Sequence, residues 1–368
     1  MRTAVRYFDH AATTPIRQVA VDAWAEHAHL LNPASQYGSG RAANAVLSEA
    51  RETIAALLGA DPIEVIFTGS GTEADNLAVQ GLFHASPSHR VISTGIEHPA
   101  VREAVEKLPG ADVELLPVGF SGHVEPTEIL DQPAALATCM WANNETGAIQ
   151  PVEDIAARAT AAGTPVHVDA VQVVGHIPVD FHAHQFSTLA ASAHKFGGPR
   201  GVGLLLARRS PKLEPVIHGG GQERGIRPGT VDAASAIATA AALKEAVGEM
   251  DSERARVSSL RDRLVSGVTA EISTARVTTT EPALPGHAHF TFPGANGDAM
   301  IMLLDGLGIE ASTGSACNSG VNQPSHVLEA MGVGSDGALR FTLGRTTTQE
   351  DVDAVVAALP EVIERATF

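Results

Sequence analysis

The sequence predicts an α/β protein, in which a large domain built on a mostly parallel sheet of seven strands is joined to a smaller α+β domain. The first observation is that short β-rich runs alternate with helical patterns between about residues 64 and 207, which is typical of a doubly wound sheet. The second is a long alanine-rich helical pattern over residues 231–268, after which the pattern changes. The third is size, because 368 residues with 44% hydrophobic content exceed what one compact domain usually holds. We expect residues 15–250 to form the large domain, and residues 1–14 with 251–368 to form the small one.

Seven short apolar runs account for the predicted strands. They are residues 65–68, 91–93, 113–116, 135–141, 166–168, 186–190 and 202–206. Polar residues lie at or just after the ends of four runs: Thr68, Asn144, Asp169 and Lys195. Ligands of doubly wound sheets bind beyond the carboxyl ends of the strands. These residues are therefore the first candidates for a binding site.

Composition excludes several classes of protein. The formal net charge of −17 argues against a protein that binds the phosphate backbone of nucleic acid, because such proteins concentrate lysine and arginine on one face. Two cysteines, Cys139 and Cys317, cannot form a disulfide framework or a four-thiolate metal site. Residues 1–9 lack the apolar core of a signal peptide, and no later run reaches the roughly 20 apolar residues of a membrane span. We expect a soluble cytoplasmic protein without direct nucleic-acid or membrane partners.

Lys195 and Asp169 are an amine and a carboxylate that each follow a short apolar run. An enzyme that uses pyridoxal 5'-phosphate (PLP) needs an amine for the Schiff base and an acid to hold the proton of the pyridine ring. Gln172 adds a neutral hydrogen-bond donor suited to the phenolic oxygen of the ring, and a carboxylate paired with the ring N–H would stay ionised. The alternative for Asp169 is a solvated helix N-cap.

The glycine-rich run at residues 68–76 follows a predicted strand and opens a helix. Its glycines, Gly71 among them, let backbone amides approach an anion. Thr72 and Asp75 have the spacing of a capping box, so the start of the helix is a candidate phosphate site. An ordinary turn between a strand and a helix is the alternative.

Three further residues fit a site for an amino-acid substrate. His98 follows the strand that ends near residue 93 and could stack on a ring and move protons, although sixteen histidines weaken the case for any one of them. Asn144 could reach cofactor or substrate, or could simply occupy a left-handed turn. Arg340 alternates with apolar neighbours, which directs it away from a buried strand face; it could clamp a substrate carboxylate or form a structural ion pair.

The two cysteines have different surroundings. Cys139 lies in an apolar run and is most simply a core residue. Cys317 lies among small polar residues and glycines over residues 314–320, which is typical of an exposed loop and suits a nucleophilic thiol. An unreactive loop cysteine is the alternative.

These motifs, taken in order, resemble the PLP-dependent cysteine desulfurases, which are fold-type I enzymes of the class V aminotransferase group. The resemblance is to the branch that contains the nitrogenase-associated and housekeeping iron–sulfur-assembly enzymes, and it covers nearly the whole chain. The matching segments are residues 7–15, 32–35, 67–76, 97–98, 142–147, 167–169, 192–195, 218–230, 314–317 and 339–341.

The resemblance implies a role for each candidate. Lys195 would hold PLP as a Schiff base, Asp169 would hold the pyridine nitrogen, and Gln172 would contact the phenolic oxygen. His98 would stack on the ring, Asn144 would lie near the phenolic oxygen and substrate, and Arg340 would bind the substrate carboxylate. Phosphate contacts would come from Gly71, Thr72, Ser192 and His194, with Thr230 supplied by the other subunit of a homodimer.

The implied reaction converts L-cysteine to L-alanine and leaves a persulfide on Cys317, from which sulfur passes to a protein acceptor for iron–sulfur cluster assembly or for tRNA or cofactor thiolation. No metal takes part in the catalytic step, although Cys317 could ligate a transient cluster. Two departures stand out. The sequence ends at Phe368, whereas housekeeping members have a longer C-terminal tail that helps dock the scaffold protein, so this partnership stays open. Ala193 stands where some members have glycine.

Related activities are the alternatives: a selenocysteine lyase, a cysteine β-lyase or an aminotransferase of the same class. Those reactions need no thiol at residue 317, so Cys317 favours the desulfurase. A non-catalytic sulfur-transfer subunit is a different class of function, and it is disfavoured because Lys195, Asp169, His98 and Arg340 are all present.

Overall fold

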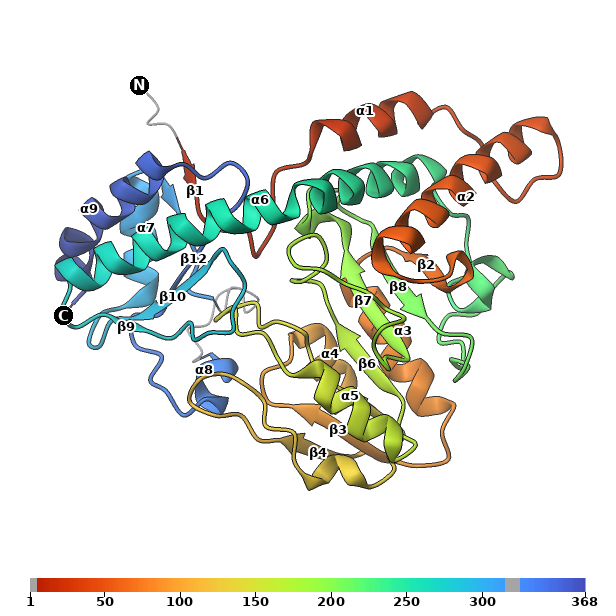
Figure 1. The fold of residues 1–368 in the computed structure, drawn as a ribbon, viewed down its shortest axis with the longest axis horizontal. Helices are drawn as coiled ribbons and strands as arrows, with labels where there is room; N and C mark the ends of the chain where they lie inside the picture. Colours follow the sequence, from red (N-terminus) through yellow and green to blue (C-terminus); the bar gives the residue numbers. More distant parts are fainter. Residues whose placement is uncertain (1–4, 315–324, 368) are drawn as a thin grey trace.

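A computed structural model describes residues 5–314 and 325–367 of the protein. The large sheet lies within the lobe on the right and lower side of Figure 1. Its seven strands lie in the order β2 (Val65–Thr68), β8 (Gly203–Ala207), β7 (Thr188–Ser192), β6 (Val166–Asp169), β5 (Leu136–Thr138), β3 (Arg90–Thr94) and β4 (Asp112–Leu116). Neighbouring strands are parallel except for β8, which is antiparallel to β2 and β7. The predicted mostly parallel sheet of seven strands is confirmed.

Each predicted run overlaps one strand, with shifts of up to three residues at the ends. The run at residues 135–141 is the one that differs most, since β5 ends at Thr138. The chain after Thr138 still runs beside β6, because the Trp141 amide donates to the Asp169 carbonyl at 2.8 Å. The chain bends away after this point, which brings Asn144 to the carboxyl edge of the sheet.

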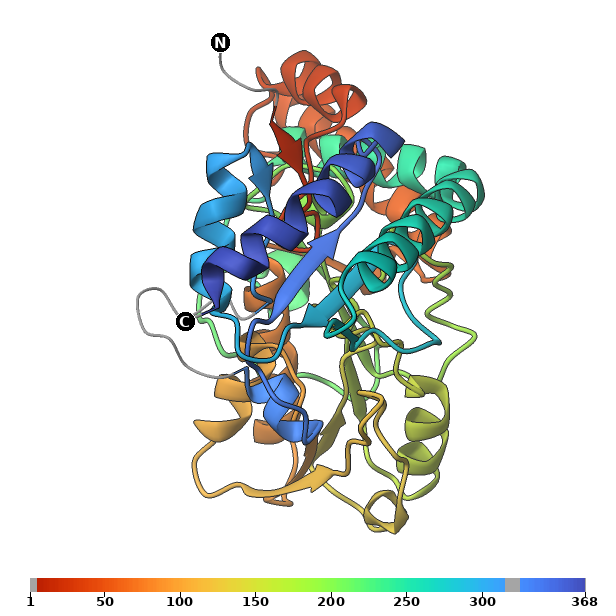
Figure 2. The same ribbon diagram turned by 90° about the vertical axis from the view of Figure 1, so that its left-hand side faces the viewer.

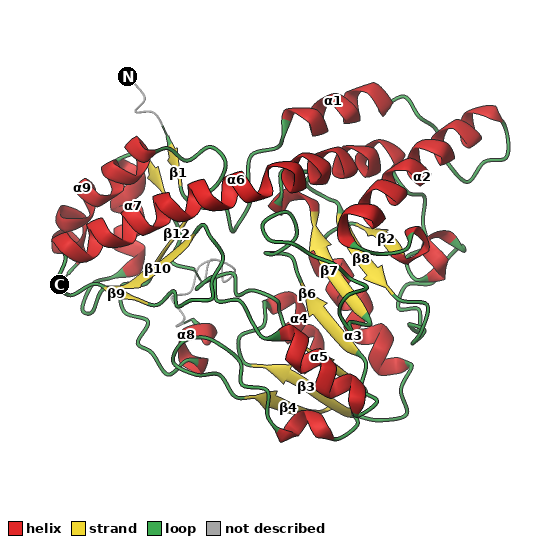
Figure 3. Cartoon of the chain, in the orientation of Figure 1, coloured by secondary structure: helices red, strands yellow, loops and turns green. Residues whose placement is uncertain are grey.

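Helices cover both faces of this sheet (Figures 1 and 3). They are α1 (Gln18–His27), α2 (Gly38–Leu58), α3 (Gly71–His84), α4 (Pro99–Glu106) and α5 (Val152–Ala161). Short 3-10 turns are η1 (Pro62–Glu64), η2 (Glu128–Asp131), η3 (Ala193–Lys195) and η4 (Gln222–Gly225). The central strands β5, β6, β7 and β8 are buried along their whole length, which is why they read as continuous apolar runs, whereas the edge strand β4 is mostly exposed.

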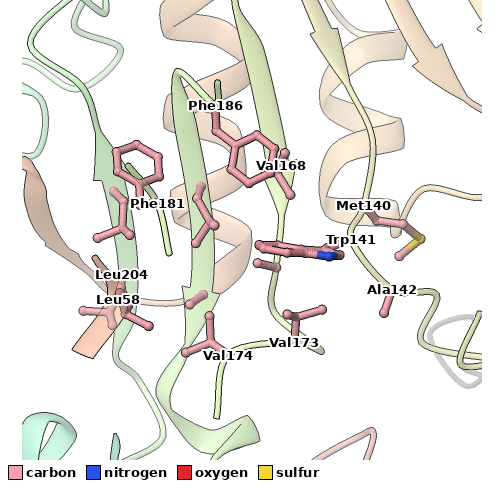
Figure 4. Packing of buried hydrophobic residues seen from close by; sticks show 14 of the residues in the cluster. Leu58, Met140, Trp141, Ala142, Val168, Val173, Val174, Phe181, Phe186 and Leu204 are labelled. Carbon is pink, nitrogen blue, oxygen red and sulfur yellow. The ribbon is translucent and has the colours of Figure 1, made fainter. Parts of the chain in front are cut away.

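The core beside the sheet is built from branched and aromatic side chains (Figure 4). Trp141 meets the edge of Phe186, with ring centroids 5.4 Å apart, and Phe181 and Val168 are also fully buried in this cluster. Aromatic pairs in this edge arrangement contribute beyond their buried area. This packing fixes the ends of the strands that carry the site.

A second hydrophobic core belongs to the other lobe. Its antiparallel sheet has β10 (His287–Thr291) between β12 (Leu339–Thr342) and β9 (Arg276–Val277), and β1 (Arg6–Tyr7) pairs in parallel with β11 (Ile309–Glu310). Its helices are α7 (Gly297–Gly306) and α9 (Gln349–Ala366), whereas α8 (His326–Ala330) packs Val327 and Leu328 into the core of the large sheet. Phe8 from the N-terminal segment packs on Phe341 and shares this core with Phe290. The two ends of the chain therefore build one lobe.

One helix connects the two lobes. α6 (Ala233–Glu271) runs across Figure 1, and its alanine-rich first half packs with α1 and α2 against the large core. Its second half places Val257, Leu264 and Val268 in the other core, where α6 lies beside α9 (Figure 2). The predicted helix over residues 231–268 is confirmed. Over residues 5–314 and 325–367, no helix has both the length and the apolar character needed to cross a membrane.

Candidate active site

A cavity of about 220 Å³ lies at the carboxyl edge of the large sheet. Every predicted cofactor residue except Thr230 lines it: Gly71, Thr72, His98, Asn144, Asp169, Gln172, Ser192, His194 and Lys195. These side chains come from different turns, and the parallel strands bring them to one edge. Thr230 is exposed and does not line the cavity. Thr68 does not line it either, because its hydroxyl donates to the Ser70 carbonyl at 2.9 Å.

The helix at one end of the cavity is capped differently from the prediction. Ser70 is the N-cap of α3 and accepts a hydrogen bond from the Glu73 amide at 3.1 Å. Glu73 in turn accepts from the Gly69 amide at 2.9 Å. The predicted box of Thr72 with Asp75 is therefore wrong, and the cap lies two residues earlier. Asp75 is buried and points to a histidine of the sheet instead.

The start of α3 presents bare backbone to the cavity. A Cβ atom added to Gly71 would lie 2.7 Å from Cγ2 of Val171 and 3.3 Å from Cβ of Ser192, so a side chain does not fit there. The first amides of a helix have no partner within the helix, and the helix dipole is positive at this end. This combination suits a phosphate group.

Asp169 ends β6, lines the cavity and is buried. Its Oδ1 accepts a hydrogen bond from the Val171 amide at 2.9 Å. Burial raises the pKa of Asp169 to about 6, while the Val171 amide and Lys195 act in the opposite direction. A cation bound against this carboxylate would favour its ionised form. The protonated nitrogen of a pyridine ring is such a group.

Lys195 ends the short turn η3 after β7. Its Nζ donates to the carbonyls of Ala11 at 2.5 Å and Ala12 at 2.9 Å. The same N-terminal segment contacts two other site residues: Gln172 donates to the Ala11 carbonyl at 2.9 Å, and His194 Nδ1 lies 3.1 Å from Thr13 Oγ1. Sequence reasoning from the residues alone missed this segment, because it contacts the site through backbone atoms that carry no sequence signal.

His98 is held by the helix that follows it. It is the N-cap of α4, and its Nδ1 accepts a hydrogen bond from the Ala100 amide at 3.1 Å. Burial lowers the pKa of His98 to about 4, with smaller effects from Lys195 and His326. The imidazole is therefore neutral at neutral pH and able to accept a proton. Its Nε2 is the ring nitrogen left for a ligand.

A buried polar cluster adjoins the cavity through Asp75 and was missed by the sequence reasoning. His167 on β6 lies 3.1 Å from Asp75 Oδ1 through Nε2 and 2.9 Å from Thr188 Oγ1 through Nδ1. Burial lowers the pKa of His167 to about 3 and raises that of Asp75 well above its usual range. The signal that could have revealed it was His167 within an apolar strand, since a buried polar group needs hydrogen-bond partners. The cluster supports the strand that carries Asp169.

Arg340 does not line the cavity, but from the second lobe it contacts Asn144, which does. All four residues of β12 are buried, so the Arg340 face is covered, contrary to the expectation from its alternation. Its Nη2 lies 2.7 Å from Asp9 Oδ1, and its Nη1 donates to the Asn144 carbonyl at 2.8 Å. The ion pair allowed by the sequence is thus present. Its Nε is buried and has no hydrogen-bond partner within residues 5–314 and 325–367.

Of the two cysteines, only Cys139 lies among the residues that the structure describes. Cys139 is completely buried, its thiol donates to the Met140 carbonyl at 3.4 Å, and burial raises its pKa well above the usual range. The prediction of a core residue is confirmed. Cys317 lies in residues 315–324, outside the described residues.

Comparison with known proteins gives one consistent result. The family model described as aminotransferase class-V matches residues 6–355. An IscS-like cysteine desulfurase of Mycobacterium tuberculosis is 47% identical, with 98% of this chain and 96% of the relative covered. The cysteine desulfurase NifS of Azotobacter vinelandii is 38% identical, with 97% and 92% covered. Among solved structures, a NifS-like protein has a TM-score of 0.91 at 35% identity and covers 98% of this chain and 100% of its own.

Proposed function

The chain belongs to the class V aminotransferase family and shares nearly its whole length with cysteine desulfurases, and we therefore propose that it converts L-cysteine to L-alanine with transfer of the sulfur to Cys317. Its fold is that of the fold-type I enzymes. The observation that carries the proposal is the single cavity that holds a lysine amine, a buried carboxylate and a bare helix start.

The family depends on PLP, and the residues of this cavity fit that group. The phosphate would lie on the start of α3 at Gly71 and Thr72, with Ser192 and His194 beside it. Asp169 would face the ring nitrogen, Gln172 the phenolic oxygen, and Lys195 would hold the cofactor covalently. When bound, the protonated ring withdraws electrons from the α-carbon of the attached substrate.

Substrate binding is assigned to Arg340 and Asn144. Arg340 is fixed by Asp9 and by the Asn144 carbonyl, so the guanidinium is already oriented before a substrate carboxylate arrives. A bidentate hydrogen bond between guanidinium and carboxylate is stronger and more directional than a contact to lysine.

Proton transfer is assigned to two groups of the cavity. The amine of Lys195, once exchanged for the amine of the substrate, takes the proton from the substrate α-carbon. His98 is neutral because burial lowers its pKa to about 4, so it can accept and return a proton beside the ring. Neither transfer needs a group from bulk water.

Sulfur transfer is assigned to Cys317. Its thiolate attacks the sulfur of L-cysteine, an S–S bond forms, and the Cβ–S bond breaks. The electron pair of that bond stays with Cβ, which gains a proton and becomes the methyl group of alanine. In total, L-cysteine and the Cys317 thiol are converted to L-alanine and a Cys317 persulfide. The outer sulfur of the persulfide then passes to a protein acceptor for cluster assembly or thiolation.

A homodimer is part of the proposal. Thr230 is exposed and outside the cavity of its own chain, which agrees with a role in the site of a second subunit. Large apolar side chains are exposed on and around α1, among them Trp24 at 48%, Leu31 at 60% and Tyr37 at 60%. Apolar clusters of this kind on a surface mark protein contacts. We also propose a cytoplasmic location, because Cys139 is a free thiol.

The test is turnover of the PLP-loaded protein with L-cysteine, with alanine and released sulfide measured. Lys195→Ala should abolish alanine formation and remove the Schiff-base absorbance band. Lys212→Ala, which removes an exposed lysine outside the cavity, should match the wild type. Alanine from L-selenocysteine but not from L-cysteine would contradict the proposed substrate.

A further inference from the structure

A second cavity, of about 80 Å³, lies between the two lobes, and the proposed reaction does not use it. Its lining includes Phe196 from the core of the large sheet, and Val257 and Leu343 from the core of the second lobe. Gln172 and Lys195 are the lining residues that it shares with the cofactor cavity. A water molecule needs about 10–15 Å³ of such space, so the cavity has room for a ligand of about five or six heavy atoms.

Three histidines line this cavity, and they differ in their hydrogen bonding. His176 has a partner, because its Nε2 lies 3.0 Å from the carbonyl oxygen of Lys195. His10 and His287 are 7% and 6% exposed, and Nε2 of each is buried without a hydrogen-bond partner among residues 5–314 and 325–367. Buried polar atoms of this kind are uncommon in folded proteins, and a bound ligand supplies the partner that they lack.

The charged side chains of the lining are mostly cationic. Besides the lysine that it shares with the cofactor cavity, the lining contains Arg17, Arg254 and Arg345, with Glu253 as its carboxylate. Arg17 and Arg254 have acidic partners on α6, and Glu253 is paired with Arg256 at 2.9 Å. Arg345 is exposed, and within the described parts of the chain its guanidinium has no ion pair or hydrogen bond. Arg345 is therefore the cation that is available to a ligand.

The ring of His10 lies near this arginine. Its Nδ1 is 2.7 Å from Thr14 Oγ1, and with the Thr14 hydroxyl donating to Nδ1, the hydrogen of the neutral ring is on Nε2. Burial lowers the pKa of His10 to about 4, and the charges of His176, Arg345 and Arg256 act in the same direction. A buried N–H donor and a nearby guanidinium favour an anion, although the chain as a whole has a formal net charge of −17.

The rest of the lining narrows the kind of anion. Met250 and Val257 on α6 and Leu343 after β12 are buried apolar side chains of this cavity. A phosphate ion has oxygen atoms on every side, and some of them would lie against these side chains without a hydrogen bond, which costs free energy. A carboxylate with a short apolar tail has one polar end and one apolar end, which matches the lining.

We propose that this cavity is a binding site for a small monocarboxylate anion of about five or six heavy atoms. Its carboxylate would bind Arg345 and the Nε2 atoms of His10 and His287, and its tail would lie against Met250 and Leu343. The site is separate from the place assigned to the substrate carboxylate, because Arg340 does not line this cavity. The inference does not depend on the desulfurase reaction.

The test is calorimetric titration of the PLP-loaded protein with sodium propionate, which has five heavy atoms. Wild type should bind with a Kd of about 1 mM or below. Arg345→Ala should raise Kd at least about tenfold, because it removes a charged hydrogen bond. Arg209→Ala removes another exposed arginine, outside the cavity, and should match wild type. Propionamide, the neutral analogue, should bind at least about tenfold more weakly than propionate.

A second variant distinguishes this cavity from the substrate site, where propionate could also bind an arginine. Arg340→Lys should bind propionate with a Kd within about twofold of wild type. Weaker binding in Arg340→Lys together with unchanged binding in Arg345→Ala would place the anion in the substrate site and overturn the proposal. A wild-type Kd above about 50 mM, or equal binding of propionate and propionamide, would also overturn it. Absence of alanine formation from L-cysteine would contradict the proposed function and leave these binding results unchanged.

Discussion

Gly71→Ala should weaken PLP binding through a contact within the protein. The added Cβ would lie 2.7 Å from Cγ2 of Val171, a distance that forces the valine to move. Val171 supplies the amide that holds Asp169 Oδ1 at 2.9 Å, so its displacement disturbs the carboxylate that would face the ring nitrogen. Overpacking of this size costs about 1–3 kcal/mol. If the cost falls on the bound state, Kd for PLP rises about 5- to 150-fold, at 1.4 kcal/mol for each factor of ten.

The assay is a titration of PLP into the cofactor-free variant, followed by its absorbance. Gly248→Ala is a matched control, since a Cβ at this helical glycine meets no atom within 4 Å. It should bind PLP like the wild type and be more stable by about 1 kcal/mol, because alanine favours the helix interior over glycine. A Kd for Gly71→Ala within about twofold of wild type would refute the role given to the start of α3.

Three further predictions concern substrate affinity and stability. Arg340→Lys should raise KM for L-cysteine about tenfold or more with a smaller change in kcat, because lysine cannot form a bidentate hydrogen bond. A lower kcat with an unchanged KM would contradict this. Glu223→Ala should lower the free energy of unfolding in urea by about 2–4 kcal/mol, because it leaves Arg51 and the Phe67 amide without their buried carboxylate. Burial lowers the pKa of His10 from 6.5 to about 4, so the unfolded chain binds a proton first as the pH falls and stability is lost below pH 6.5. Wild type should therefore lose about 2 kcal/mol more than His10→Asn between pH 8 and pH 5, and parallel curves would contradict that pKa.

The positions of the strands along the chain could be predicted, because burial on both faces of the central strands produces apolar runs that stand out locally, whereas their order in the sheet was not predicted. The same logic placed Asp169 and Lys195 at one edge, since parallel strands end together. The N-cap residue of α3 could not be predicted from the apolar runs. Ser70 with Glu73 and Thr72 with Asp75 have equal spacing, and the choice depends on His167, which binds Asp75 from β6.

Contacts between distant parts of the chain were beyond the sequence. Asp9 and Arg340 form their ion pair across 331 positions, and no local pattern links them. The carbonyl of Ala11 accepts from both Lys195 and Gln172, and a backbone carbonyl is the same in every residue. Such partners follow from packing of the two lobes, which local propensity does not encode.

The most direct test of the desulfurase reaction is a single turnover of PLP-loaded protein with L-cysteine, in which alanine and protein-bound persulfide are quantified. Wild type should give one alanine and one persulfide on Cys317 for each active site, and Cys317→Ala should give neither. Cys139→Ala, which removes the buried thiol, should behave like wild type. Undiminished alanine with free sulfide from Cys317→Ala would mean a lyase and would contradict the role given to this cysteine.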